Sequence, residues 1–218
     1  VVYSGKNGMV ATGRSMDWKT EMHSNLWVFP KGMERNGETG SNSLKWTSKY
    51  GSVVTSAFEI ASTDGMNEKG LVANLLWLPE AEYPIRDQSK PGLAITAWVQ
   101  YMLDNFATVD EAVAAIDENT FQVVSDMMPD GSRLATLHLS ISDATGDCAI
   151  FEYIGGKLTV YHSKEYKVMT NSPTYNKQLA LNEYWKSIGG LSFLPGTNRP
   201  SDRFARASFY INALPQTD

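Results

Sequence analysis

The sequence is poor in cysteine and histidine, and this scarcity excludes several kinds of site. Cys148 is the one cysteine in 218 residues, so an intrachain disulfide is excluded. The three histidines show no His-x-x-x-His spacing, and no Cys-x-x-Cys pair occurs, so no metal site is expected. A glycine-rich phosphate loop is also lacking, which argues against a nucleotide site. We therefore expect no cofactor.

Long apolar runs and clusters of basic residues are also lacking. No stretch approaches the length of a membrane span, so we expect no membrane partner. The net charge is −5 and the basic residues are scattered, which disfavours nucleic acid as a partner. The chain is 42% hydrophobic and 20% charged, a composition typical of a globular protein of one domain, residues 1–218.

A nucleophile is missing at the place where the polar residues suggest one. The strand-like run from Val1 leads to Arg14 and Asp17, and such a pair at a strand end is typical of an anionic reaction centre. No serine, threonine or cysteine stands at position 1. We therefore expect the nucleophile just upstream of the printed sequence.

The remaining pattern predicts strands, two helices, strands and two helices. The expected strands are Met9–Arg14, Leu26–Phe29, Leu44–Thr47, Ser52–Ala57, Leu71–Leu76, Leu134–Ser142, Cys148–Tyr153, Leu158–Tyr161 and Tyr166–Thr170. The expected helices are Gly92–Asn105, a helix after the capping box Thr108–Glu111, Tyr175–Ile188 and Ser201–Ala213. This order favours antiparallel sheets covered by helices, an α+β domain.

Four polar islands stand at strand ends, and each has a structural as well as a functional interpretation. They are Arg14–Asp17, Asp64–Gly70, Thr170–Pro173 and Pro195–Phe204. Arg14 and Asp17 could form a structural ion pair. The second island is a good turn sequence, and Asn171 could simply begin a loop. Asp202 and Arg203 could cap and pair on the last helix.

In their order along the chain and in the residues they contain, these islands resemble the motifs of one enzyme family over the whole chain. The matching motifs are Gly13–Trp18, Trp46–Ser52, Gly65–Leu71, Tyr101–Val109, Met169–Pro173, Leu194–Asn198 and Asp202–Phe204. The sequence is similar to the choloylglycine hydrolases, which include bile salt hydrolases and penicillin V acylases. Its motifs look most like those of the family branch that is found in gut Bacteroidetes. The resemblance implies an N-terminal nucleophile (Ntn) hydrolase, an α+β fold built as a four-layered αββα sandwich and incomplete here at both ends.

The resemblance implies where the nucleophile lies. In the family it is a cysteine that removal of preceding residues exposes, so we expect it a few residues before Val1. Its α-amino group would take the thiol proton. Arg14 would stabilise the thiolate, and Asp17 would orient the α-amino group. Cys148 is expected to be an inert core thiol, because it stands in the middle of a strand.

The resemblance also implies how the reacting carbonyl is held. The side-chain amide of Asn171 and the backbone N–H of Trp77 would bind the oxyanion, and Arg203 would be a further polar member of the site. Leu78 and Tyr83, an apolar and an aromatic residue close to Trp77 in sequence, are candidates for binding the acyl group, and ordinary core positions at a strand end explain them equally well.

The implied activity is hydrolysis of a linear amide C–N bond through an acyl-cysteine intermediate. We expect the small-molecule substrate to be a glycine- or taurine-conjugated bile salt. Alternatives are penicillin V, an N-acyl homoserine lactone, or a pseudoenzyme that binds bile salts without turnover. The 218-residue chain by itself is expected to be inactive. Relatives suggest a homotetramer for the full-length protein and a periplasmic or secreted location, with the cytoplasm as the alternative.

Overall fold

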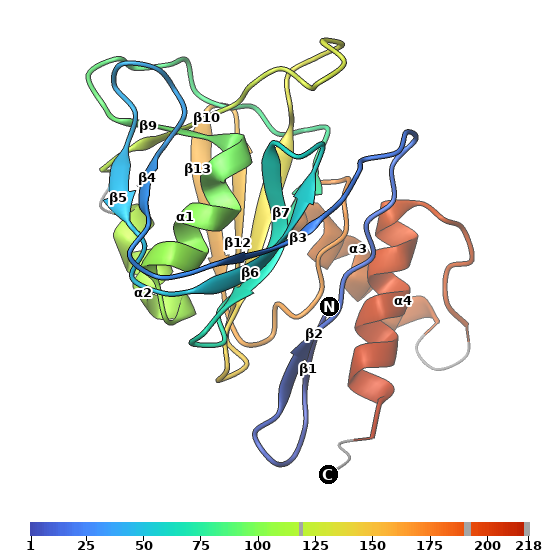
Figure 1. The fold of residues 1–218 in the computed structure, drawn as a ribbon. Coiled ribbons are helices and arrows are strands. Elements are labelled where there is room, and N and C mark those ends of the chain that lie inside the picture. Colours follow the sequence, from blue (N-terminus) through green and yellow to red (C-terminus); the bar gives the residue numbers. More distant parts are fainter. Residues whose placement is uncertain (118–119, 190–192, 216–218) are drawn as a thin grey trace.

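The centre of the computed structural model is a seven-stranded antiparallel sheet in the order β13-β12-β11-β8-β7-β6-β3 (Figure 1). The structure describes residues 1–117, 120–189 and 193–215. The strands are β1 (Val2–Ser4), β2 (Val10–Thr12), β3 (Leu26–Phe29), β4 (Glu34–Asn36), β5 (Lys45–Thr47), β6 (Ser52–Ala57), β7 (Ala61–Asn67), β8 (Val72–Trp77), β9 (Gly92–Ala94), β10 (Gln122–Val124), β11 (Leu137–Ser142), β12 (Cys148–Ile154) and β13 (Lys157–His162). The helices are the 3-10 turn η1 (Ile95–Ala97), α1 (Trp98–Asn105), α2 (Val109–Asp117), α3 (Tyr175–Ile188) and α4 (Pro200–Ala213).

Both faces of this sheet are covered, as the burial of β12 shows. Successive side chains of a strand point to opposite faces. Phe151 therefore packs against Trp98 of α1 in the larger hydrophobic cluster, whereas Ile150 joins Tyr175 of α3 and Phe204 of α4 in the smaller one. Figure 1 shows α1 and α2 on one side of the sheet and α3 and α4 on the other. This arrangement confirms the α+β class.

Extended chain lies between the sheet and the helices α3 and α4. Val168 and Met169 belong to the same cluster as Ile150 of the sheet and Phe204 of α4. The β1–β2 hairpin is attached to this segment, because the amide of Val2 donates to the carbonyl of Lys167 over 2.8 Å. The segment that leads to Asn171 is thereby held by the smaller hydrophobic cluster and by the backbone of β1.

Most of the expected elements are confirmed, but four differ, among them the expected strand Leu134–Ser142, which begins only at Leu137. The expected strand Tyr166–Thr170 is extended chain outside any strand of the structure. The expected helix Gly92–Asn105 divides into β9, η1 and α1, because Gly92–Ala94 pairs in parallel with β10. The expected strand Met9–Arg14 is shorter, Val10–Thr12. The capping box is confirmed in part, since Thr108 accepts from the amide of Glu111 while the Glu111 carboxylate accepts from Ala107.

Strand β7 is the longest of the strands that the sequence did not reveal, the others being β4, β9 and β10. Its residues, Ala-Ser-Thr-Asp-Gly-Met-Asn, show neither a run of β-branched side chains nor a clean alternation. Gly65 explains part of this composition, since a Cβ there would lie 2.7 Å from the Val53 carbonyl oxygen and 2.7 Å from a methyl of Leu103 in α1. A glycine lets helix α1 pack closely on the sheet.

The predicted turn after β7 is confirmed, and Asn67 closes it. Asn67 is 3% exposed. Its Oδ1 accepts from the amides of Lys69 and Leu71, and its Nδ2 donates to the carbonyls of Leu103 and Phe106 at the end of α1. One side chain thus joins the β7–β8 turn to the helix.

None of the helices in the described ranges is both long and apolar enough to span a membrane.

We predict that Asn67→Ala lowers the free energy of unfolding by about 3 kcal/mol, because it leaves several buried backbone groups without partners. Chemical denaturation of the full-length protein measures this change. Asn212→Ala is the matched control: Asn212 is exposed on α4 and makes one hydrogen bond, to the Ser208 carbonyl. A loss equal to that of the control would contradict the bridging role of Asn67.

Candidate active site

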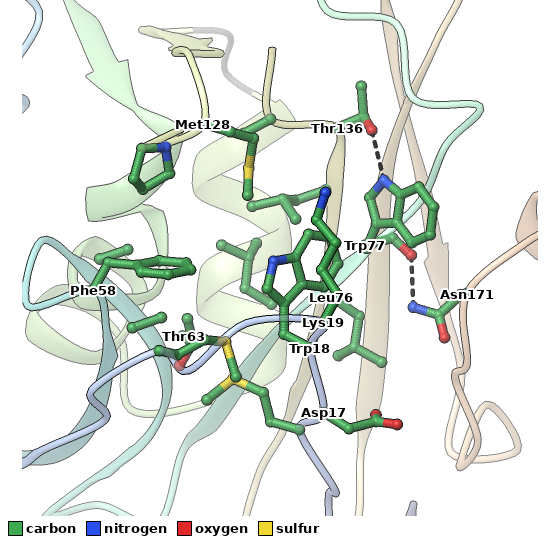
Figure 2. Close-up of a pocket in the computed structure, with 18 of the residues that line it drawn as sticks. Asp17, Trp18, Lys19, Phe58, Thr63, Leu76, Trp77, Met128, Thr136 and Asn171 are labelled. Carbon is green, nitrogen blue, oxygen red and sulfur yellow. Dashed lines mark hydrogen bonds between the residues drawn. The ribbon is translucent and has the colours of Figure 1, made fainter. Parts of the chain in front are cut away.

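A cavity of about 770 Å³ opens where the polar islands meet. Its walls come from the segment after β2, the ends of β7 and β8, the loop between β10 and β11, the loop after residue 170 and the start of α4. Figure 2 shows Asp17, Trp77 and Asn171 around this cavity, with Phe58 and Met128 on its far side. Arg14 and Arg203 also line it. The structure therefore brings together five of the predicted site residues.

The cavity forms where β8 continues past its partner β7. These strands pair only from Asp64–Met66 to Val72–Asn74, yet β8 extends to Trp77. On its other edge, β8 pairs with β11 throughout, and the Leu78 amide donates to the Thr136 carbonyl. Because hydrogen-bonded pairs alternate along an antiparallel ladder, the N–H and C=O of Leu75 and Trp77 point away from β11.

Arg14 binds to this free edge of β8. One terminal nitrogen of its guanidinium donates to the Leu75 carbonyl over 3.1 Å, and the other pairs with the carboxylate of Asp64. Asn74 donates to the second oxygen of Asp64 over 2.8 Å. The interpretation of Arg14 and Asp17 as an ion pair is therefore wrong, because the partner of Arg14 is Asp64 of β7.

Asn171 binds to the same edge, one residue pair further on. Its Nδ2 donates to the Trp77 carbonyl over 2.7 Å (Figure 2), and its Oδ1 accepts from Arg203 over 2.7 Å. These two bonds fix the orientation of the amide, since Arg203 can only donate and a carbonyl can only accept. The N–H of Trp77 lies on the same free edge of β8, and both Asn171 and Trp77 line the cavity.

Asp17 and Asp202 differ in their surroundings. Asp17 is exposed at the mouth and has no hydrogen-bond or ion-pair partner within the described ranges. Asp202 accepts from Thr197 over 2.6 Å, so it stabilises the loop before α4 rather than pairing with Arg203. Arg203 instead bonds Asn171 and the carbonyl of Asn198.

Two indole rings and a guanidinium form the aromatic wall of the cavity. The rings of Trp18 and Trp77 meet edge to face at 5.8 Å. The Arg133 guanidinium lies 4.6 Å from the ring centre of Trp77 and 5.9 Å from that of Trp18, within the range of a cation–π contact. The indole N–H of Trp77 is held by Thr136 (Figure 2). Lys19 and Arg133 add two basic side chains to the lining, which also contains the carboxylates of Asp17 and Asp126.

Leu78 and Tyr83 do not line the cavity, so their prediction as acyl-binding residues is corrected. Leu78 is 0% exposed and lies in the core, because strand alternation turns it away from the face that Trp77 and Pro79 present. Tyr83 stacks on Tyr153 and donates to the Leu137 carbonyl over 2.7 Å. Burial raises the pKa of the Tyr83 hydroxyl, which is consistent with a structural role.

Cys148 is buried, as expected, and is not among the residues that line the cavity. Desolvation, followed by the nearby carboxylates of Asp147 and Asp143, raises the pKa of its thiol to about 12. The thiolate is the reactive form of cysteine, so this thiol is inert at neutral pH.

Sequence reasoning missed Asp64, Trp18 and Arg133 as site residues. The sequence predicts Asp64 as part of a turn, whereas the residue lies in strand β7. Trp18 belongs to the motif Gly13–Trp18, but the sequence predicts no role for its side chain. Arg133 gave no local signal, because its contact with both indoles depends on how a loop of the β10–β11 connection folds over β8.

Among the residues that the structure describes, one group of potential metal ligands lies outside this cavity. Ligand atoms of Asp110, Asp147 and His162 lie within 4.8 Å of one another. His162 already hydrogen-bonds Asp147 over 2.7 Å, so its ring is satisfied without a metal ion.

The chain matches known proteins along its whole length. The family of linear amide C–N hydrolases called the choloylglycine hydrolase family matches residues 1–218. A penicillin V acylase of Pectobacterium atrosepticum is 57% identical over 207 residues, which are 92% of this chain and 55% of that protein. The chain thus spans about half the length of this curated relative.

Solved structures give the same result. The penicillin V acylase of Agrobacterium tumefaciens superimposes with a TM-score of 0.92 and 60% identity, over 100% of this chain and 66% of that one. A variant of the conjugated bile acid hydrolase of Clostridium perfringens gives 0.81 and 28%, over 97% and 71%. This chain belongs to the choloylglycine hydrolase family of linear amide C–N hydrolases.

Proposed function

We propose that the full-length protein hydrolyses the linear amide of penicillin V or a similar arylacyl amide, with a cysteine a few residues before Val1 as the nucleophile. The observation that carries this proposal is the convergence of Arg14, Asn171 and the Trp77 backbone on one edge of β8. Such a cluster of donors is suited to the negative charge that develops when an amide carbonyl is attacked.

The register of the β1–β2 hairpin supports the position of the nucleophile. Val1 and Gly13 exchange both backbone hydrogen bonds at 2.9 Å, one step beyond the pair Val2–Thr12. Residues before Val1 that continued this ladder would lie opposite Arg14 and the residues after it, which line the cavity. Arg14 also has a buried Nε with no partner in the described part of the chain, a donor available to an anion.

In the proposed reaction, the α-amino group of the cysteine takes the thiol proton, and the sulfur bonds the carbonyl carbon. The oxyanion accepts hydrogen bonds from the Asn171 amide and the Trp77 N–H. The C–N bond then breaks, and the departing amine takes a proton from the ammonium group. Water next attacks the thioester, which releases the acid and restores the thiol. Arg14 stabilises the thiolate, Asp17 orients the α-amino group, and Arg203 holds Asn171.

The aromatic wall favours an aryl acyl group over a steroid. Trp18 and Trp77 both line the cavity, and a phenyl ring that packed against either indole would gain an aromatic contact. Lys19 and Arg133 would attract an anionic amine product, which suits the penicillin nucleus and suits glycine or taurine equally. The two penicillin V acylases named above are also much more similar in sequence than the bile acid hydrolase.

Conjugated bile salts are the second candidate. The cavity volume is within the range of about 300–1,000 Å³ that is usual for small-molecule sites. Its lining includes the apolar residues Met22, Phe58, Ile60, Met127 and Met128, so a larger apolar ligand is also compatible.

We predict that penicillin V is hydrolysed with a higher kcat/KM than glycocholate or taurocholate. Trp18→Ala should lower kcat/KM for penicillin V by about tenfold, because one aromatic partner of the phenyl ring is lost. Steady-state release of each amine measures both effects. Trp185→Ala is the control, since Trp185 belongs to α3 and is not among the residues that line the cavity. Faster turnover of the bile salts would overturn the arylacyl assignment and favour the second candidate.

We predict that Asn171→Ala lowers kcat by about 10²–10³ while KM changes little, as expected for a donor to the oxyanion. Asn176→Ala is the matched control, because Asn176 is exposed at the start of α3, five residues along the chain. Single-turnover kinetics would separate acylation from hydrolysis of the thioester. An unchanged kcat in Asn171→Ala would rule out the proposed oxyanion site.

We predict that Cys148→Ala keeps kcat within about twofold and that iodoacetamide inactivates this variant as fast as the parent protein, because a buried protonated thiol does not react. The 218-residue chain should show no turnover. Loss of alkylation sensitivity in Cys148→Ala would contradict an upstream nucleophile. Binding of bile salts without turnover by the full-length protein would favour the pseudoenzyme alternative.

A further inference from the structure

A buried pair of ionisable side chains lies behind the loop that carries Asn171. His138 of β11 and Glu152 of β12 are both 0% exposed. The Nδ1 of His138 is 2.9 Å from Oε1 of Glu152, and its Nε2 is 2.9 Å from the carbonyl oxygen of Thr170. Thr170 directly precedes Asn171. Burying such groups is costly unless their hydrogen bonds are satisfied, so the reason for this pair must be sought in its contacts.

The pair holds the Asn171 loop at both ends. A carbonyl oxygen can only accept, so Nε2 of His138 donates to the carbonyl of Thr170. A second hydrogen bond joins Nδ1 of His138 to the side chain of Glu152. The carboxylate of Glu152 also accepts from the amide of Tyr175, at 2.9 and 3.1 Å. Tyr175 is the first residue of α3. The residues between Thr170 and Tyr175, Asn171 among them, are therefore fixed at each end by one buried pair.

Gln178 fixes the middle of the same loop. It is 0% exposed on α3. Its Nε2 donates to the carbonyls of Asn171 and Pro173, and its Oε1 accepts from the Thr170 hydroxyl over 2.9 Å. The backbone of Asn171 is thus anchored from behind, while its side chain is held in front by Trp77 and Arg203.

We propose that His138 and Glu152 are positioning residues for catalysis. They fix the position of the Asn171 side-chain amide relative to strand β8, and thereby determine how well this amide can donate to the oxyanion. This inference rests on the oxyanion role of Asn171 in the proposed function. Neither residue lines the cavity, so neither would touch the substrate. Their effect on the rate would pass entirely through the loop that they bracket.

The test compares two substitutions in the full-length enzyme. His138→Phe keeps a planar ring but removes both hydrogen bonds, and we expect kcat to fall by about 10–100-fold with KM within about threefold, because small errors in the position of a catalytic group are costly. Glu152→Gln should keep kcat within about threefold, since its amide can donate to Nδ1 and accept from Tyr175. Steady-state kinetics with the best substrate measures both.

A double-mutant cycle separates positioning from general destabilisation. If His138 acts through Asn171, then His138→Phe in the Asn171→Ala background should cause little further loss of kcat. Asp104→Asn is the matched control, because Asp104 is 0% exposed and hydrogen-bonded to Trp46 and Gln100 on the other side of the sheet. It should lower the melting temperature and leave kcat unchanged. Additive losses in the cycle, or an equal loss of kcat in the control, would overturn the proposal.

Hydrogen exchange keeps the inference independent of activity. Amides in the peptide 170–178 should exchange faster in His138→Phe than in the parent protein or in Asp104→Asn, and should stay protected in Glu152→Gln. If the parent protein cleaves no acyl amide, the proposed function fails, while this measurement still decides whether the pair holds the loop. Unchanged exchange in His138→Phe would refute the positioning role in either case.

Discussion

The free edge at the end of β8 is the constraint on which the candidate site depends. An antiparallel strand that extends beyond the end of its partner strand leaves backbone N–H and C=O groups without a ladder partner. When these groups are buried, they must form hydrogen bonds elsewhere. Here the partners are side chains: Arg14 takes the carbonyl of Leu75, and Asn171 takes that of Trp77. Two residues more than 150 positions apart in the sequence, Arg14 and Asn171, thereby bind the same edge of β8, and the cavity lies beside this edge (Figure 2).

Charge is held in place on both sides of this edge. Asp64 compensates Arg14 and is itself held by Asn74, so the guanidinium is fixed before any substrate arrives. Arg203 orients the carboxamide of Asn171 from α4, and the buried pair His138–Glu152 anchors the backbone behind it. Groups fixed in this way need little reorganisation when charge develops, which is the property that makes an oxyanion site effective.

The sequence predicted much of the fold, because strong local patterns agree with the tertiary structure. The bounds of β3, β6 and α3 are as expected, since each has clear periodicity and turn residues at its ends. Prediction failed where packing overrides local preference. Strand β7 lacks the usual strand pattern because the glycine at Gly65 lets helix α1 pack closely and because Asp64 forms an ion pair with Arg14. Nearness in sequence to Trp77 predicts Leu78 and Tyr83 in the cavity, whereas strand alternation places Leu78 in the core and a ring contact with Tyr153 packs Tyr83 against it.

By itself, the sequence determined the α+β class, the family resemblance and which polar islands would meet, because motifs of several residues are specific enough to identify a family. Tertiary structure decided the partners within the site: that Arg14 pairs with Asp64, that Trp18 and Trp77 form one wall with Arg133, and that His138 supports the loop of Asn171. These contacts join residues far apart in the chain. They depend on strand register and on where β7 leaves β8, and no local pattern encodes either of these.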